Sequence, residues 1–132
     1  MKKRLVTLLG ISAIILFALT GCVGNSMSFA WSIIGGSHTE GNNSWTITAN
    51  TVNGHASRKI NFSADNLAAL HVKNTNSEGK VSITLTQGNT EKTFDVSGTF
   101  DGSIDTSAFA PGKITIRLDF ESAKTVDVAV NW

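Results

Sequence analysis

The chain has almost no cysteine and, for most of its length, no surplus of basic residues. Cys22 is the only cysteine, so no intramolecular disulfide can form and the fold must be held by its own hydrophobic core. Three of the eleven Lys and Arg residues precede Cys22, which leaves eight against ten Asp and Glu in the rest of the chain. This slightly acidic remainder lacks the basic stripe of nucleic-acid-binding proteins, so no nucleic-acid partner is expected.

Long apolar runs are also absent, with one exception at the N-terminus. Residues 2–4 are basic, residues 5–19 carry no charge, and a glycine then precedes Cys22. The uncharged stretch is short for a bilayer span, which needs about 20 residues. A basic start, a short apolar segment and a small residue before a cleavage point are typical of a secretory signal.

The last four residues of this segment, Leu19-Thr20-Gly21-Cys22, resemble the lipobox of bacterial lipoproteins. The pattern of that family is an aliphatic residue, a variable one, then Gly or Ala, and then Cys, and all four positions match. The resemblance covers residues 1–22. It implies that the Cys22 sulfur carries a diacylglyceryl group, that a signal peptidase cuts between Gly21 and Cys22, and that the lipid bilayer is a partner through the acylated Cys22.

The resemblance divides the chain into a signal peptide over residues 1–21, a lipidated tether over residues 22–27 and a folded domain over residues 28–132. The alternative is that Cys22 is an ordinary residue of an uncleaved N-terminal anchor. Both interpretations place the folded domain outside the cytoplasm. The first predicts a lipid-anchored protein on the extracytoplasmic face of the cell membrane.

Apolar and polar residues alternate along most of the remaining chain, as they do in half-buried antiparallel strands. The clearest segments are KITIRLDFE, TVDVAVNW and KVSITLTQ, and weaker ones are SFAWSII, SWTITA, SRKINFS, LAALHVKN and TEKTFDVSG. Turn signals separate the segments at Asn53-Gly54, Glu78-Gly79, Gly88-Asn89 and Pro111-Gly112. The start of LAALHVKN also suits a helical turn. The sequence therefore predicts an all-β fold, an antiparallel β-sandwich of about eight strands.

Two segments interrupt the alternation. Residues 35–44 are rich in Gly and Asn, and we expect either a mobile loop or the end of the tether there. Residues 98–113 form a longer connection, whose Phe100, Ile104 and Phe109 are expected to close one end of the sandwich. The string F-x-P-G-K-I-T-I at the end of this connection resembles the turn before a late strand of immunoglobulin-like sandwiches, a local resemblance that implies no functional residue.

The three tryptophans and the outward threonines bear on binding. Trp31, Trp45 and Trp132 are in phase with inward apolar residues, which favours core packing over a platform that stacks on sugars. Five outward positions carry threonine, an ordinary residue on a solvated strand face: Thr46, Thr48, Thr84, Thr86 and Thr115.

No set of residues predicts catalysis or metal binding, so no catalytic residue, metal ligand or cofactor is assigned. His38 and Glu40 have a spacing that suits two ligands of a zinc site, but no second pair of ligands is evident. Asp101 and Asp105 lie close in the sequence, but they do not match the acid spacing of an EF-hand loop. His71 is expected at the surface. No G-x-S-x-G nucleophile motif is present, and the protein is not expected to be an enzyme.

These features predict a lipid-anchored lipoprotein with a non-catalytic role in binding or in envelope structure. A carbohydrate or cell-wall-polymer binding module is the alternative, and a small envelope hydrolase is the weakest candidate. Because few residues separate Cys22 from the first predicted strand, the expected partner is a membrane-proximal protein or a wall polymer.

Overall fold

The computed structural model describes residues 27–132, and most of them lie in antiparallel β-strands. The predicted signal peptide, Gly21, Cys22 and all but the last residue of the predicted tether lie outside the described residues. The strands are β1 (Met27–Ile34), β2 (Ser37–Glu40), β3 (Ser44–Phe62), β4 (His71–Thr75), β5 (Glu78–Gln87), β6 (Thr90–Asp95), β7 (Thr99–Ser103) and β8 (Gly112–Asn131). A short helix, α2 (Ala64–Ala68), follows β3. The prediction of an all-β fold with about eight antiparallel strands is confirmed.

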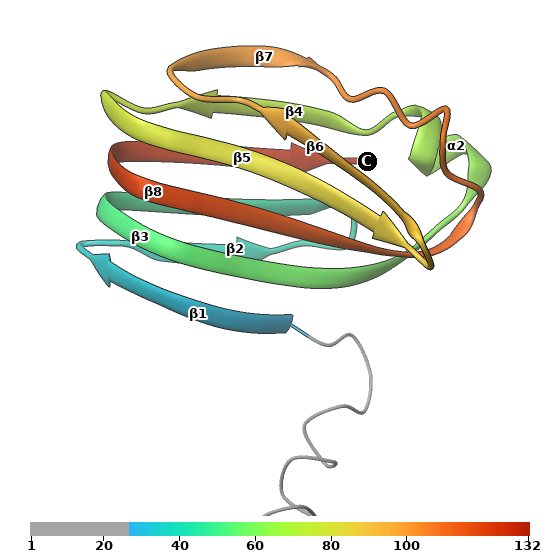
Figure 1. The fold of residues 1–132 in the computed structure, drawn as a ribbon, viewed down its shortest axis with the longest axis horizontal. Coiled ribbons are helices and arrows are strands. Elements are labelled where there is room, and N and C mark those ends of the chain that lie inside the picture. Colours follow the sequence, from blue (N-terminus) through green and yellow to red (C-terminus); the bar gives the residue numbers. More distant parts are fainter. Residues whose placement is uncertain (1–26) are drawn as a thin grey trace, which may run out of the picture.

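The two longest strands, β3 and β8, pair with each other along almost their whole length and bend at the same place (Figure 1). The pairing register shifts between Val52 and Gly54 of β3. Beside this shift, Ser122 and Thr125 of β8 have positive φ angles of 47° and 52°. Such a register shift is a β-bulge, which increases the local twist and bends the strand.

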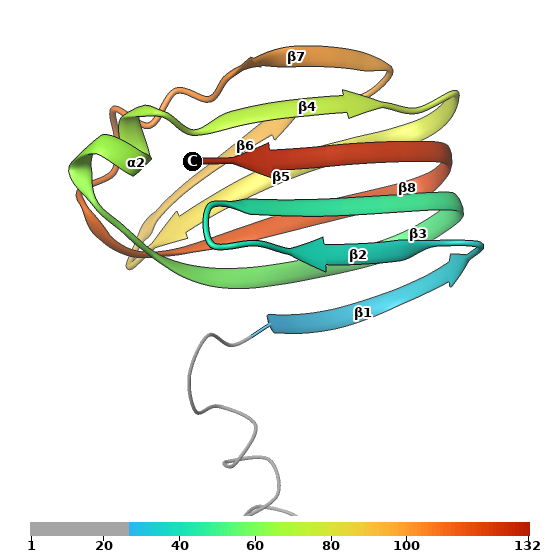
Figure 2. The same cartoon turned by 180° about the vertical axis from the view of Figure 1, so that it is seen from behind.

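This bend folds one continuous sheet into two layers, which Figures 1 and 2 show from opposite sides. The front layer, which faces the viewer in Figure 1, has the order β1, the C-terminal half of β3, the N-terminal half of β8, β5 and β6. The back layer has the order β2, the N-terminal half of β3, the C-terminal half of β8, β4 and β7. The predicted β-sandwich is therefore formed by a single sheet that folds over itself.

Alternate residues of the strands fill the space between the layers. In each half of β8, on either side of the bend, every second residue is buried in the phase that the sequence predicts. The fully buried side chains of the sandwich include Ile47, Ile83 and Leu118. Burying one such side chain stabilises the fold by about 1.5–3 kcal/mol. Trp45 and Trp132 lie in this core as expected, but Trp31 is only half-buried.

The open end of the sandwich is closed by α2 and by the connection between β7 and β8 (Figure 1). Ile104 and Phe109 of this connection are buried, as is Leu67 of α2, whereas Phe100 is half-buried against the core. Ser63 caps the helix, because its Oγ accepts a hydrogen bond of 3.1 Å from the backbone N–H of Asn66. The expected closure of one end by these side chains is confirmed for Ile104 and Phe109.

Three parts of the strand assignment differ from the prediction. The segments on either side of Asn53-Gly54 form one bent strand, because this pair makes a bulge that stays beside β8 instead of a hairpin turn. Part of the segment over residues 35–44 is strand β2, an edge strand whose side chains are all exposed and therefore give no apolar alternation. Strand β7 likewise lies within the predicted connection over residues 98–113.

Strand β1 forms the start of the described sheet. It pairs with β3 from Met27 through Ile34, so the described sheet begins at the first described residue. Residues 28–34 therefore belong to the sandwich, and β2 adds residues 37–40 to the same sheet.

Candidate functional site

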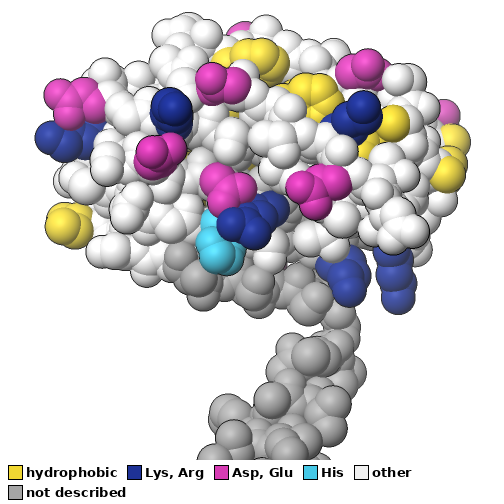
Figure 3. All heavy atoms as spheres, in the orientation of Figure 1, with side chains coloured by type: hydrophobic (Ala, Val, Ile, Leu, Met, Phe, Trp, Pro, Cys, Tyr) yellow, Lys and Arg dark blue, Asp and Glu magenta, His cyan; other side chains and the backbone are white. Residues whose placement is uncertain are grey.

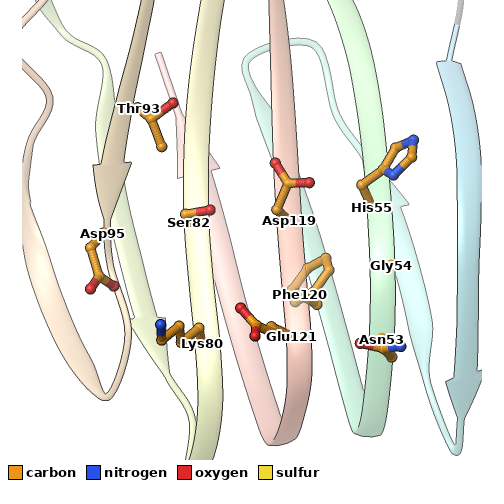
Figure 4. Close-up of a pocket in the computed structure, with 10 residues that line it drawn as sticks. All are labelled: Asn53, Gly54, His55, Lys80, Ser82, Thr93, Asp95, Asp119, Phe120 and Glu121. Atoms are coloured by element: carbon orange, nitrogen blue, oxygen red, sulfur yellow. The ribbon is translucent and has the colours of Figure 1, made fainter.

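A groove of about 550 Å³ lies on the outer face of the front layer. Four neighbouring strands, β3, β8, β5 and β6, supply its lining residues, which Figure 4 shows. The groove lies near the bend, where the bulge at Gly54 interrupts the regular ladder between β3 and β8. Gly54 faces Phe120 across the strands, and the ring centroids of Trp31 and Phe120 lie 6.2 Å apart.

A row of four polar residues crosses this groove at right angles to the strands. His55 of β3 pairs with Asp119 of β8, Asp119 pairs with Ser82 of β5, and Ser82 pairs with Asp95 of β6. These side chains point outward because they alternate along their strands with buried residues. Lys80 and Glu121 form a second, shorter row beside the first.

The order of this row does not suit nucleophilic catalysis. Asp119 stands between Ser82 and His55, so the hydroxyl and the imidazole are two strands apart, or about 10 Å at a strand spacing of about 4.8 Å. A serine nucleophile needs its base within about 2.6–3.2 Å. The groove can offer hydrogen bonds and charges of both signs to a ligand, but this Ser and this His do not form a nucleophile–base pair.

The polar surface continues from the groove along the front layer. A second hollow of about 340 Å³ shares Ser82, Thr93 and Asp119 with the groove and extends to Thr84, Thr86, Glu91 and Arg117. The guanidinium of Arg117 contacts the Asp119 carboxylate, with an Nη2–Oδ1 distance of 2.8 Å. Figure 3 shows acidic and basic side chains interspersed over this face. No tryptophan is among the described residues that line either hollow.

One carboxylate of the groove has a perturbed pKa. Hydrogen bonds from the side chain and the backbone of Ser97 lower the pKa of Asp95 from its ordinary value, and Lys80 lowers it further. The backbone N–H of Ser97 donates to Asp95 Oδ1 at 2.9 Å. This carboxylate therefore stays negatively charged in neutral solution and is held in place beside the groove.

A third, smaller cleft of about 250 Å³ lies where the loop between β2 and β3 meets the end of β8. Its lining includes four asparagines, Asn42, Asn43, Asn61 and Asn66, together with Arg58 and Trp132. Arg58 is only 6% exposed, and its guanidinium lies 5.3 Å from the centroid of the Trp132 ring.

Sequence reasoning missed Arg58, although a signal was present. Arg58 has the same phase as Ile60 and Phe62, which face inward on β3. A basic residue in the inward phase of a strand indicates that its charge is paired with another buried group or that it belongs to a binding site. The asparagines of the cleft gave no comparable signal, because they come from segments whose meeting depends on the fold.

The residues that we considered for metal binding lie apart from one another or have other partners. His71 Nε2 and Asp101 Oδ1 are 2.5 Å apart, and the carboxylate of Asp105 accepts a hydrogen bond from the N–H of Ser107. His38 and Glu40 lie on the exposed edge strand β2. Within residues 27–132, no three His, Cys, Asp or Glu side chains come together in a group that could hold a metal ion.

Comparison with known proteins gives no family assignment. No family model matches the chain, and no curated protein matches it. In the described part of the chain, no helix is long and apolar enough to cross a membrane. The residues themselves must therefore carry any argument about function.

Proposed function

We propose that the protein is a lipid-anchored lipoprotein whose β-sandwich binds a partner close to the membrane and has no catalytic role. The lipobox Leu19-Thr20-Gly21-Cys22 supports the anchor. A diacylglyceryl group supplies two acyl chains, and two chains hold a protein stably on a bilayer, whereas one gives only marginal binding.

The start of β1 supports the position close to the membrane. Because β1 is paired with β3 from Met27 onward, only the short segment after Cys22 remains to span the distance to the bilayer. At about 3.3–3.6 Å per residue, this segment reaches about 20 Å. The partner is then a lipid surface, the outer loops of a membrane protein or the innermost layer of the wall.

The polar groove of the front layer is the observation that carries the binding role. Its volume is about 550 Å³, four strands build it, and it presents charges of both signs beside hydroxyl groups. A rigid sheet positions such groups well for recognition. The separation of Ser82 from His55 by Asp119 supports a non-catalytic role.

The anchor is tested by expressing the full chain and the variant Cys22→Ala in a bacterium that is fed radiolabelled palmitate. We expect the label and the membrane localisation in the parent protein only, together with cleavage after Gly21. The substitution Ser26→Ala is the matched control, because it changes a residue of the same segment outside the lipobox. A Cys22→Ala protein that is cleaved and membrane-held like the parent would contradict the lipoprotein proposal.

The reach of the domain is tested by limited proteolysis of the intact lipoprotein on vesicles. We expect residues 28–44 to resist cleavage, because β1 and β2 are paired with β3. Rapid cleavage within residues 28–44 that releases a folded remainder would show a long tether and would contradict the membrane-proximal position.

Binding of a carbohydrate or a wall polymer is the second candidate function. It is favoured by Trp132, which lines a polar cleft together with four asparagines. Asparagine side chains both donate and accept hydrogen bonds, as the hydroxyl groups of a sugar require. Retention of the protein on immobilised wall polymers, compared with beads without polymer, tests this role.

A further inference from the structure

Arg58 is the most unusual residue of the described fold. It lies on the inward face of β3 and is 6% exposed, although its guanidinium always carries a positive charge. A buried charge is costly unless an opposite charge and hydrogen bonds compensate it. The surroundings of Arg58 supply only part of this compensation.

The hydrogen bonds of Arg58 are few and long. Nη1 donates to the backbone oxygen of Ser44 at 3.2 Å, and Nη2 donates to that of Gly41 at 3.3 Å. The buried Nε has no hydrogen-bond partner. A guanidinium has five N–H donors, so most of its donor capacity remains unused.

No described carboxylate neutralises the charge. The three ion pairs of residues 27–132 involve His71, Arg117 and Lys124, and none includes Arg58. The face of the Trp132 ring stabilises the cation in part, since the distance of 5.3 Å is within the range of a cation–π contact. None of the side chains that line the cleft is acidic, so no side chain of its lining balances the charge of Arg58.

The rest of the cleft indicates the chemistry of a ligand. Asn42, Asn43, Asn61 and Asn66 carry neutral amides that can bind hydroxyl groups as donors or as acceptors. The volume of about 250 Å³ suits one small ring or acid, below the usual range of drug-sized pockets. A single positive charge matches a carboxylate, whose charge is −1, better than a doubly charged phosphate.

We propose that this cleft binds the carboxylate of an acidic sugar, with Arg58 as its charge partner and the asparagines as partners of the sugar hydroxyls. The proposal rests on the polymer-binding role above and names its site and ligand class. It does not depend on lipidation at Cys22. The ligand supplies the anion that the buried guanidinium lacks.

The test is isothermal titration of the full-length protein, solubilised in detergent, with sodium glucuronate, with glucose and with inorganic phosphate. We expect binding of glucuronate and none of glucose, because only the carboxylate engages Arg58. Binding of glucose equal to that of glucuronate, or binding of phosphate without glucuronate, would overturn the assignment. Failure of the parent protein to bind glucuronate would overturn it as well.

Two substitutions in the cleft and one beside it locate the site. Asn66→Asp places a carboxylate in the cleft that competes with the ligand for Arg58, so glucuronate should bind about tenfold more weakly or worse. Arg58→Lys keeps the charge but loses the planar fork and should also weaken binding. Lys59→Met removes a neighbouring charge from the exposed outer face of β3 and should leave affinity unchanged.

The variants distinguish an error in the proposed binding site, the Arg58 cleft, from an error in the proposed polymer-binding role. Arg58→Lys alters a buried position, so the half-buried helix residue Asn66 keeps the test valid if that variant does not fold. If Asn66→Asp folds and binds glucuronate like the parent, the cleft is not the site. Beads carrying polygalacturonate then test the role. Retention of both the parent and Asn66→Asp would keep the polymer-binding role and refute the cleft, whereas glucuronate binding in the cleft without retention would refute the role alone.

Discussion

Placing an aspartate at position 118 tests both the core and the electrostatics of its interior. Leu118 is fully buried in β8, and its cross-strand partners are Ala56 of β3 and Ile83 of β5. Leu118→Asp loses about 1.5–3 kcal/mol of apolar burial. It also buries a carboxylate among apolar neighbours, which costs several kcal/mol more. The sum approaches the whole stability of a domain of this size, about 5–15 kcal/mol.

Ile116→Asp makes the same change two residues earlier, but with a different neighbour. Ile116 is equally buried, and its cross-strand partner on β3 is Arg58. Opposite charges in such a pair attract, and an uncompensated buried charge costs about 3–5 kcal/mol that a paired one avoids. We therefore expect Ile116→Asp to be clearly more stable than Leu118→Asp, although less stable than the parent protein.

The measurement is urea unfolding of the full-length protein, followed by tryptophan fluorescence, because Trp45 is fully buried. Thr115→Asp is the control, since Thr115 faces outward and pairs with Lys59. This control should unfold at a urea concentration close to that of the parent. Equal midpoints for Leu118→Asp and Thr115→Asp would mean that the register of β8 is wrong. Equal midpoints for Ile116→Asp and Leu118→Asp would refute the claim that Arg58 lacks a charge partner.

Two further predictions concern the backbone and the acid range. Gly79→Ala should lower the melting temperature by more than Gly88→Ala. Both glycines have positive φ angles, which disfavour alanine. Only at Gly79 would the new Cβ also collide with the backbone, at the oxygen of Ser122. The lowered pKa of Asp95 means that the folded state favours the ionised form of this side chain. The ionised carboxylate therefore stabilises the fold above its unfolded pKa, and this stabilisation is lost as the pH falls through its folded pKa. An NMR titration should place the pKa of Asp95 below the ordinary value of an aspartate side chain, and Ser97→Ala should raise this pKa.

Alternation in the sequence was sufficient to predict the fold class and the buried face of each main strand. In β8 the inward phase agrees with the burial of Ile114, Leu118 and Val128, because the side-chain period of a strand is two and one face must be dry. The same signal fails for β2, where all four side chains are exposed. Alternation also does not distinguish a hairpin at Asn53-Gly54 from a bulge, since both use residues that adopt unusual backbone angles.

The polar row of the groove could not be predicted from the sequence, for a different physical reason. The row from His55 through Asp119 and Ser82 to Asp95 joins residues that are far apart in the chain, and only the pairing register aligns them. A shift of one residue in any strand would turn the side chain of that strand inward and break the row. The sequence contains the members of such a row but not the order of the strands that aligns them.

The bend of β3 and β8 forms the Arg58 cleft, and Arg58 lies beside the start of β1, the end of the domain to which the proposed anchor is attached. Ser44 and Arg58 belong to the same strand and are 14 residues apart, yet the guanidinium reaches the Ser44 oxygen at 3.2 Å. In a straight strand these residues would be separated by about 46 Å, so only the fold of the sheet assembles the cleft. Arg58 is also the cross-strand partner of Met27, the first residue of β1. If Cys22 carries the lipid, the cleft therefore lies beside the point where the domain is tied to the membrane. A carboxylate bound there must come from a molecule within reach of the headgroups, and a short acidic polymer segment at the membrane surface meets that requirement better than a distant layer of the wall.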